Sequence, residues 1–318
     1  MRSLRSIVVT GAAGSVGSAV ARQLLSLDEV ESVVALDILP AEAGARALAP
    51  QSSDPRFRYY QADAGDEGML NTLIKEVQAT GLFNLAEKRA GDSILETNVI
   101  APATLLRVCR LIGVPFLQAS TDVVYGDVPS PARATEEWPL QAGTTFAASK
   151  ASAELLCFAA TREYGQDVVV TRGAPTYGPR LPSDHRLTAF IRAAVREEPL
   201  VLPGDGMQIR NWLHLDDHCS GIIEAFRRAK SGDAYNLNGN CERTILGIAR
   251  SIVSVLNKPE SLIRPGQQFV PLAPRCATDG SRMTSYTGWC PRREFKSSFA
   301  PVIREAAANL APSADPTR

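Results

Sequence analysis

A glycine-rich turn between an apolar run and a helical pattern constrains this chain more than any other feature. Gly11, Gly14 and Gly17 follow the β-branched run at residues 7–10, and the apolar stripe of a helix begins directly after them. Glycines at this spacing let the backbone turn sharply and approach a pyrophosphate, whose charge then meets the helix N-terminus. The pattern therefore predicts a strand, a phosphate-binding turn and a helix at the start of a nucleotide-binding domain.

Asp37 extends this prediction to a dinucleotide. It comes twenty residues after Gly17, at the end of the next apolar run at residues 33–36. A carboxylate there accepts hydrogen bonds from the adenosine ribose hydroxyls and repels a 2′-phosphate. Ile38, rather than an arginine, follows it. The sequence thus favours NAD over NADP as the cofactor.

Short β-branched runs continue to alternate with helical patterns along the N-terminal half. They lie at residues 57–60, 82–85, 114–119 and 168–171. This alternation is typical of an α/β fold, here a Rossmann-type doubly wound parallel sheet. Two proline-punctuated stretches break the rhythm and predict a smaller C-terminal substrate-binding lobe. We expect residues 1–174 plus about 211–240 to form the NAD-binding domain, about 175–210 plus 241–310 the lobe, and 311–318 a disordered tail.

Composition excludes several classes of function. Lys plus Arg equals Asp plus Glu at 34 each, so no net charge points to nucleic acid or a membrane surface. Apolar runs stay below the roughly 18 residues that a membrane helix needs, and no signal-peptide pattern follows Met1, which favours the cytoplasm. His214 and His218 have metal-pair spacing but no third ligand, and the six cysteines are scattered, so we expect no metal.

Many partial motifs, in a consistent order, carry a resemblance to a known family. They are the three glycines, Asp63-Ala64, residues 84–86, Thr97-Asn98, residues 120–127, Phe146 to Lys150, residues 177–179, 204–213 and 288–291. The chain resembles the extended short-chain dehydrogenase/reductase family, specifically its NAD-dependent nucleotide-sugar epimerases and dehydratases. The resemblance implies an enzyme that binds NAD and a nucleotide-diphosphate sugar.

The same resemblance implies roles for individual residues. Its implied cofactor-binding residues are Gly11, Gly14, Ser15, Val16, Gly17, Asp37, Ile38, Asp63, Ala64, Leu85, Ala86, Asn98, Lys150 and Pro175. Its implied substrate-binding residues are Glu87, Ser120, Phe146, Arg210 and Arg275, the two arginines serving the diphosphate or its ribose. Thr121, Asp122, Lys150 and Tyr177 are the candidate catalytic residues, with Asp122 as the acid that protonates a departing hydroxyl.

The departures from the family pattern affect positions at which the family has catalytic residues. Phe146 stands four residues before Lys150, where the family has a tyrosine whose pKa the lysine lowers. Val123 replaces the glutamate beside the acid. Losing one general base costs about 10²–10⁴ in rate. We therefore expect reassigned acid–base residues, drawn from Asp122, Lys150, Tyr177, Glu87 and Lys88.

Two alternatives stay open at this point. NAD could be structural, with the protein acting as a redox-neutral lyase, isomerase or cyclase. The chain could also be a non-catalytic protein that binds NAD and a nucleotide sugar. For assembly, the resemblance implies a homodimer formed by helices near 101–111 and 145–163, whose apolar residues include Ile100, Leu105, Val108, Leu155 and Phe158.

Overall fold

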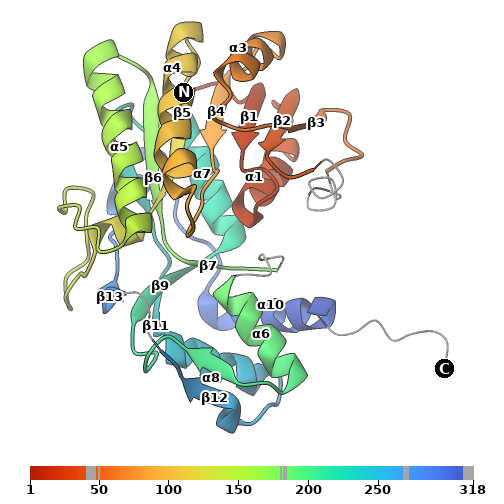
Figure 1. Cartoon of the computed structure of the whole chain (residues 1–318), viewed down its shortest axis with the longest axis vertical. Coiled ribbons are helices and arrows are strands. Elements are labelled where there is room, and N and C mark those ends of the chain that lie inside the picture. The colour runs from red at the N-terminus through yellow and green to blue at the C-terminus, as the bar shows by residue number, and fades with distance from the viewer. Residues whose placement is uncertain (41–47, 49–50, 180, 182–184, 268–271, 311–318) are drawn as a thin grey trace, which may run out of the picture.

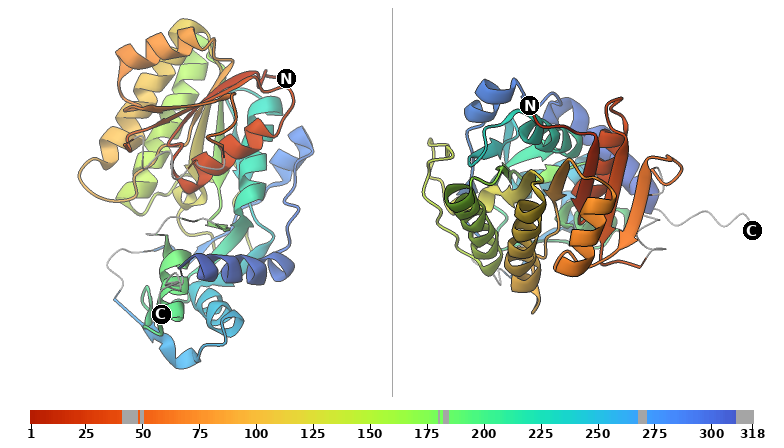
Figure 2. Two further views of the ribbon diagram at one scale, coloured as in Figure 1. Left: turned by 90° about the vertical axis from the view of Figure 1, so that its right-hand side faces the viewer. Right: turned by 90° about the horizontal axis from the view of Figure 1, so that it is seen from above.

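The computed structural model has two parts, a larger domain built around a parallel sheet and a smaller lobe (Figure 1). It describes residues 1–318 except 41–47, 49–50, 180, 182–184, 268–271 and 311–318. The predicted tail, residues 311–318, therefore lies outside the described residues. In the larger domain, helices lie on both faces of a central sheet (Figure 2).

Seven parallel strands form the central sheet, in the order β10-β6-β5-β4-β1-β2-β3. Their bounds are β1 Ser6–Thr10, β2 Ser32–Asp37, β3 Phe57–Gln61, β4 Gly81–Asn84, β5 Phe116–Thr121, β6 Val168–Gly173 and β10 Ala234–Leu237. The chain order reverses beside β1, which places a crevice at the carboxyl ends of the strands. The predicted α/β Rossmann-type fold is confirmed.

Alternate side chains of the strands build two separate cores. Val9 packs in the cluster under α1 (Ser15–Leu25) and α7 (Leu215–Arg228), together with Ala35 and Phe226. Val8 packs on the opposite face with Val34, under α3 (Glu67–Glu76), α4 (Ala101–Ile112) and α5 (Thr145–Tyr164). A strand that is apolar at every position is buried on both faces, which is why these runs do not alternate with polar residues.

A buried ion pair fixes α5 against the sheet. Arg172 of β6 donates to Glu154 of α5 from both Nε and Nη2, at 2.9 and 2.7 Å. Its Nη1 donates to the hydroxyl of Tyr125 at 2.7 Å, and that hydroxyl donates to Asn236 of β10 at 2.8 Å. Tyr125 belongs to the short helix η2 (Asp122–Tyr125) that follows β5. The network therefore locks α5, η2 and two strands at the edge of the sheet where the predicted site lies.

The smaller lobe contains two small sheets and three of the described helices. One sheet pairs β7 (Thr176–Tyr177), β9 (Ile209–His214), β11 (Cys241–Thr244) and β13 (Arg275–Cys276); the other pairs β8 (Leu200–Leu202) with β12 (Ile263–Pro265). The helices are α6 (Arg186–Arg196), α8 (Ile245–Val255) and α10 (Phe295–Leu310), with the single turn η3 (Glu260–Leu262). Strand β9 runs directly into α7, so the lobe is joined to the larger domain by continuous chain.

Two elements outside these layers complete the described structure. Helix η1 (Glu96–Ile100) precedes α4, and α9 (Ser281–Thr287) packs on α7 and β10. Helix α5 begins where the Thr144 side chain accepts from the Ala147 N–H, and it ends at Gly165 in a left-handed conformation. No helix in the described ranges has both the length and the apolar character needed to span a membrane.

Candidate active site

The glycine turn has the close packing that a pyrophosphate cradle requires. Gly11 has φ +63°, and a Cβ built on it would lie 2.6 Å from the Ala86 backbone. A Cβ on Gly17 would lie 2.2 Å from the Gly11 carbonyl oxygen. Gly14 precedes the first turn of α1 and contributes no capping side chain to its N–H groups. The turn thus presents open helix N–H groups to an anion, and the residues fit a dinucleotide.

Asp37 lies directly beside this turn. Its Oδ2 accepts from the Ala13 N–H at 2.9 Å, and its Oδ1 accepts from the Leu39 N–H at 3.2 Å. The two backbone donors hold the carboxylate at the end of β2, where an adenosine ribose would reach it. The other predicted cofactor residues flank the same edge of the sheet: Ser15 and Val16 open α1, Ile38 follows β2, Asp63 and Ala64 follow β3, Leu85 and Ala86 follow β4, and Pro175 follows β6.

Lys150 and Phe146 share the first turns of α5, and the lysine has a carboxylate partner. The Lys150 side chain is 2% exposed, and its Nζ lies 3.6 Å from Glu87 Oε2. Burial lowers the pKa of the Lys150 ammonium, while the Glu87 charge opposes this shift. Burial acts to raise the pKa of Glu87, but the charges of Arg89 and Lys150 outweigh it and hold that pKa below its ordinary value. Glu87 is therefore ionised, and its lowered pKa makes it a weaker base than an ordinary glutamate.

Asp122 follows β5 as the first residue of η2 and is buried. Its Oδ1 accepts a long hydrogen bond from Thr121 Oγ1 at 3.4 Å, and its Oδ2 has no partner in the described part of the chain. The neighbouring Ser120 hydroxyl is also buried without a partner among the described residues. Burial raises the pKa of Asp122 to about 6, against the opposing charge of Arg210 and the Thr121 hydrogen bond. A carboxyl with this pKa keeps a substantial protonated fraction near pH 6, far more than an ordinary aspartate, and can donate that proton.

Comparison with known proteins places the chain in a family. The model of the NAD dependent epimerase/dehydratase family matches residues 7–238. This chain belongs to that family. It is 31% identical to a dTDP-glucose 4,6-dehydratase from Actinoplanes, over 95% of this chain and 98% of the relative. Solved dTDP-glucose 4,6-dehydratases also match it, from Streptomyces venezuelae (TM-score 0.91, 31% identity, 96% and 97% coverage) and Bacillus anthracis (TM-score 0.90, 28% identity, 96% and 97% coverage).

Both of these structures contain NAD. Membership in an NAD-dependent family, together with the glycine turn and Asp37, identifies this chain as an NAD-dependent enzyme of the epimerase/dehydratase type. The predicted cofactor is confirmed.

Asn98, which the resemblance places at the cofactor, makes three side-chain hydrogen bonds to protein groups. Its Oδ1 accepts from the Lys88 N–H at 2.8 Å, and its Nδ2 donates to the Lys88 carbonyl at 2.7 Å and to Ser149 Oγ at 2.9 Å. Asn98 thus ties the loop after β4 to the start of α5. This loop carries Glu87, which lies beside Lys150, and Arg89, which lies over Phe146.

Two further predicted residues, Tyr177 and Arg275, bond to other protein groups. Tyr177 was a candidate acid or base, but its ring is 1% exposed in the core of the smaller lobe and its hydroxyl bonds Ser298 Oγ at 2.7 Å. Arg275 was a candidate substrate ligand, but its guanidinium bonds both Glu242 oxygens at 2.8 and 3.0 Å. It also donates to two carbonyls of the loop after η2. The polar groups of both side chains are hydrogen-bonded to other protein groups.

The structure adds two arginines that the sequence did not single out. Arg89, in the loop after β4, has its guanidinium carbon 5.1 Å from the centre of the Phe146 ring. Arg186 is the first residue of α6. Burial lowers the pKa of Arg186, and the charges of Arg210 and Arg89 lower it further. The three arginines come from the loop after β4, from α6 and from β9, and they influence one another electrostatically.

The surroundings of His218 differ from those of His214, although the two histidines have the spacing of a metal-ligand pair. It lies against the Gly173 backbone at the end of β6, and neither of its ring nitrogens has a partner among the described residues. Burial lowers its pKa to about 4, with the Glu87 charge opposing, so it is neutral near pH 7. His214 instead caps α7, accepting from the Asp216 N–H at 3.1 Å. The two histidines thus have different surroundings.

Proposed function

We propose that this chain modifies a nucleotide-diphosphate sugar and does so with reassigned acid–base residues. The observation that carries the proposal is the pair formed by Asp122 and Phe146: the acid is kept, with a pKa of about 6, while the family's phenol is missing. Relatives named dTDP-glucose 4,6-dehydratase match nearly the whole chain, which supports the substrate class.

The residues at the sheet edge divide into two groups under this proposal. Gly11, Gly14, Asp37 and Lys150 would hold NAD, whose nicotinamide supplies a hydride acceptor when bound. Asp122 would donate its proton to an oxygen leaving the sugar, and the Thr121 hydroxyl beside it would orient the reacting group. The smaller lobe would close over the sugar nucleotide, with Arg210 and Arg186 facing its diphosphate.

A redox-neutral reaction is the second candidate, and one arrangement favours it. Removing a hydride from a sugar alcohol requires a base for the hydroxyl proton. At the family's position for that base, Phe146 presents an apolar ring partly covered by Arg89. Lys150 is paired with Glu87 rather than with a phenol. An elimination or epimerisation that needs no alcohol oxidation agrees better with these contacts.

Binding measurements test the substrate class. With NAD present, we expect calorimetry to detect binding of at least one of UDP, dTDP and GDP. Arg210→Gln should weaken that binding by about tenfold or more, since a phosphate then lies near fewer cations. Arg196→Gln, at the far end of α6, is the matched control and should change nothing. If none of the three nucleotides binds, the substrate class proposed here is incorrect.

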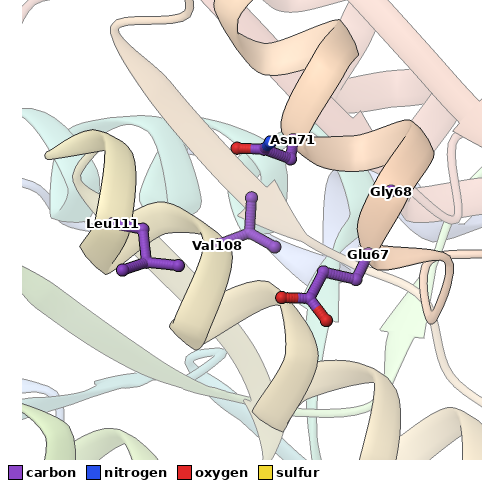
Figure 3. Close-up of a pocket in the computed structure, with 5 residues that line it drawn as sticks. All are labelled: Glu67, Gly68, Asn71, Val108 and Leu111. Carbon is purple, nitrogen blue, oxygen red and sulfur yellow. The ribbon is translucent and has the colours of Figure 1, made fainter.

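We also propose a homodimer through α4 and α5. Leu105 and Val108, expected in part at this surface, are buried in the larger domain, whereas Ile100, Leu111 and Leu155 are 59%, 68% and 60% exposed. A shallow pocket of about 340 Å³ adjoins Leu111 between α3 and α4, lined also by Glu67, Gly68, Asn71 and Val108 (Figure 3). Light scattering at micromolar concentration should give twice the mass of one chain, and Leu155→Glu should halve it. A monomer mass for the native protein would contradict the proposal.

A further inference from the structure

His218 is a buried side chain whose polar atoms have no protein partner. It lies in the first turn of α7 and is 8% exposed, and neither Nδ1 nor Nε2 has a hydrogen-bond partner among the described residues. Burying an imidazole in this way costs free energy, because both nitrogens lose their hydrogen bonds to water. Buried polar groups in native proteins are nearly always satisfied, so a partner from outside the chain is expected at this ring.

The ring of His218 lies at the carboxyl end of β6, on the face of the sheet that α7 covers. A Cβ built on Gly173, the last residue of β6, would lie 2.3 Å from His218 Nε2 and 2.7 Å from its Cε1. The imidazole thus occupies the space that a side chain at position 173 would need. Gly173 is the register partner of Thr121 on β5. Side chains at paired positions of parallel strands point to the same face, about 4.8 Å apart, so the ring lies beside the Thr121 side chain.

The order of the strands places the nicotinamide half of the cofactor over this end of the sheet. Asp37, at the end of β2, lies where the adenosine ribose would reach it, and the glycine turn after β1 fits the pyrophosphate. Strands β4, β5 and β6 lie on the other side of β1. A dinucleotide that crosses β1 therefore extends its nicotinamide toward the carboxyl ends of these three strands. Glu87, in the loop after β4, acts electrostatically on His218, which agrees with a ring close to the same edge.

We propose that His218 hydrogen-bonds the carboxamide of the nicotinamide and fixes the orientation of that ring. A neutral imidazole has one N–H donor and one acceptor nitrogen, and a primary carboxamide has an acceptor oxygen and N–H donors, so the two groups are complementary. Burial lowers the pKa of His218 to about 4, which keeps the imidazole neutral. A protonated histidine would instead repel the positive charge of the oxidised nicotinamide. The inference concerns the cofactor and holds for either of the two candidate reactions.

Calorimetry with NAD and with ADP-ribose, which lacks the nicotinamide, tests this assignment. His218→Leu removes both nitrogens, and we expect it to weaken NAD binding by about tenfold while leaving the affinity for ADP-ribose within about twofold. His218→Gln keeps a donor and an acceptor, so it should retain most of the affinity for NAD. Urea unfolding without ligand should show His218→Leu to be at least as stable as the native protein, because it removes two unpartnered nitrogens from a buried position.

Thr171→Val is the matched control. Thr171 precedes Gly173 by two residues on β6, so its side chain points to the same face, and its buried hydroxyl also lacks a partner within the described part of the chain. It lies deeper in the sheet, away from the carboxyl edge, and its substitution should leave both affinities unchanged.

Three results would overturn the inference. Equal weakening of NAD and ADP-ribose by His218→Leu would assign His218 to the shape of the whole cleft. Unchanged affinity for both ligands would leave ordered water as the partner of the ring. A His218→Gln variant that binds NAD as weakly as His218→Leu would show that hydrogen bonding by the imidazole is not what holds the nicotinamide.

Discussion

Asp122→Asn is expected to lower turnover of the sugar nucleotide by about 10²–10⁴-fold, the usual contribution of a general acid. Asparagine has nearly the same shape, so the neighbouring Thr121 and Ser120 should keep their places. In the native protein, kcat/KM should fall as the pH rises past about 6, because the acid then loses its proton. This limb of the pH profile should disappear in the variant.

The same substitution should stabilise the fold above pH 6. The folded-state pKa of Asp122, about 6, lies above its ordinary value of 3.8, so the folded state binds the proton more tightly. The stability that this proton contributes is present at low pH and is lost as the pH rises through about 6. The difference of about two pKa units corresponds to about 3 kcal/mol, the cost of an ionised carboxylate in this buried position. Asparagine cannot ionise and avoids that cost.

Urea unfolding at about pH 8 and about pH 4.5 measures this effect. The variant should be more stable than the native protein at the higher pH, and this gain should shrink to about a third at the lower, because pH 4.5 lies between the two pKa values. Asp127→Asn, at an exposed carboxylate five residues along the chain, is the control and should show no such pH-dependent gain. A variant that is equally active, or that gains no stability at pH 8, would show that Asp122 is an ordinary ionised residue.

The fold was predictable because its signals are local. Strands buried on both faces appear as short apolar runs, and Val8 and Val9 show why, since they enter two different cores. The glycine turn is likewise a property of the backbone: Gly11 and Gly17 are required by contacts under 3 Å at the positions where a Cβ would be. Features of this kind depend on neighbouring residues in the chain, so the amino-acid sequence alone predicts the cofactor edge.

Side-chain direction was less predictable, because it depends on distant partners. Tyr177 turns into the smaller lobe, where Ser298 of α10 accepts or donates a hydrogen bond. Arg275 turns toward Glu242 of β11. Asn98 turns toward the backbone of Lys88. Each of these polar groups is satisfied by a residue that no local pattern connects to it.

Arg89 was not predictable for the same reason. It lies in the loop after β4, beside the candidate residues Glu87 and Lys88, and its stacking on Phe146 depends on how that loop meets the start of α5. The ring that stands in place of the family's phenol and the cation over it are thus far apart in the sequence and in contact in the structure.

Phe146→Tyr is expected to raise the rate of alcohol oxidation above that of the native protein. The new hydroxyl would lie one helical turn from Lys150, whose ammonium lowers the pKa of a nearby phenol. In the native protein with NAD and its sugar nucleotide, we expect no rise in the near-ultraviolet absorbance of reduced nicotinamide. In the variant we expect this absorbance to rise on mixing, because the phenol can take the proton of a sugar hydroxyl. The gain should be about 10²–10⁴-fold in the rate of that step.

Two double variants, which change the charge at or beside Lys150, test whether the gain comes from the lowered pKa of the new phenol. Adding Lys150→Met to Phe146→Tyr should remove the absorbance change, since the phenol then keeps an ordinary pKa. Adding Glu87→Gln instead should enlarge it, because Glu87 neutralises the Lys150 charge at 3.6 Å in the native protein. Stopped-flow absorbance on the native protein and the three variants makes the comparison. A full-amplitude signal from the native protein would show that Phe146 has not silenced hydride transfer, and Asp122 or Lys150 would then be the surrogate base.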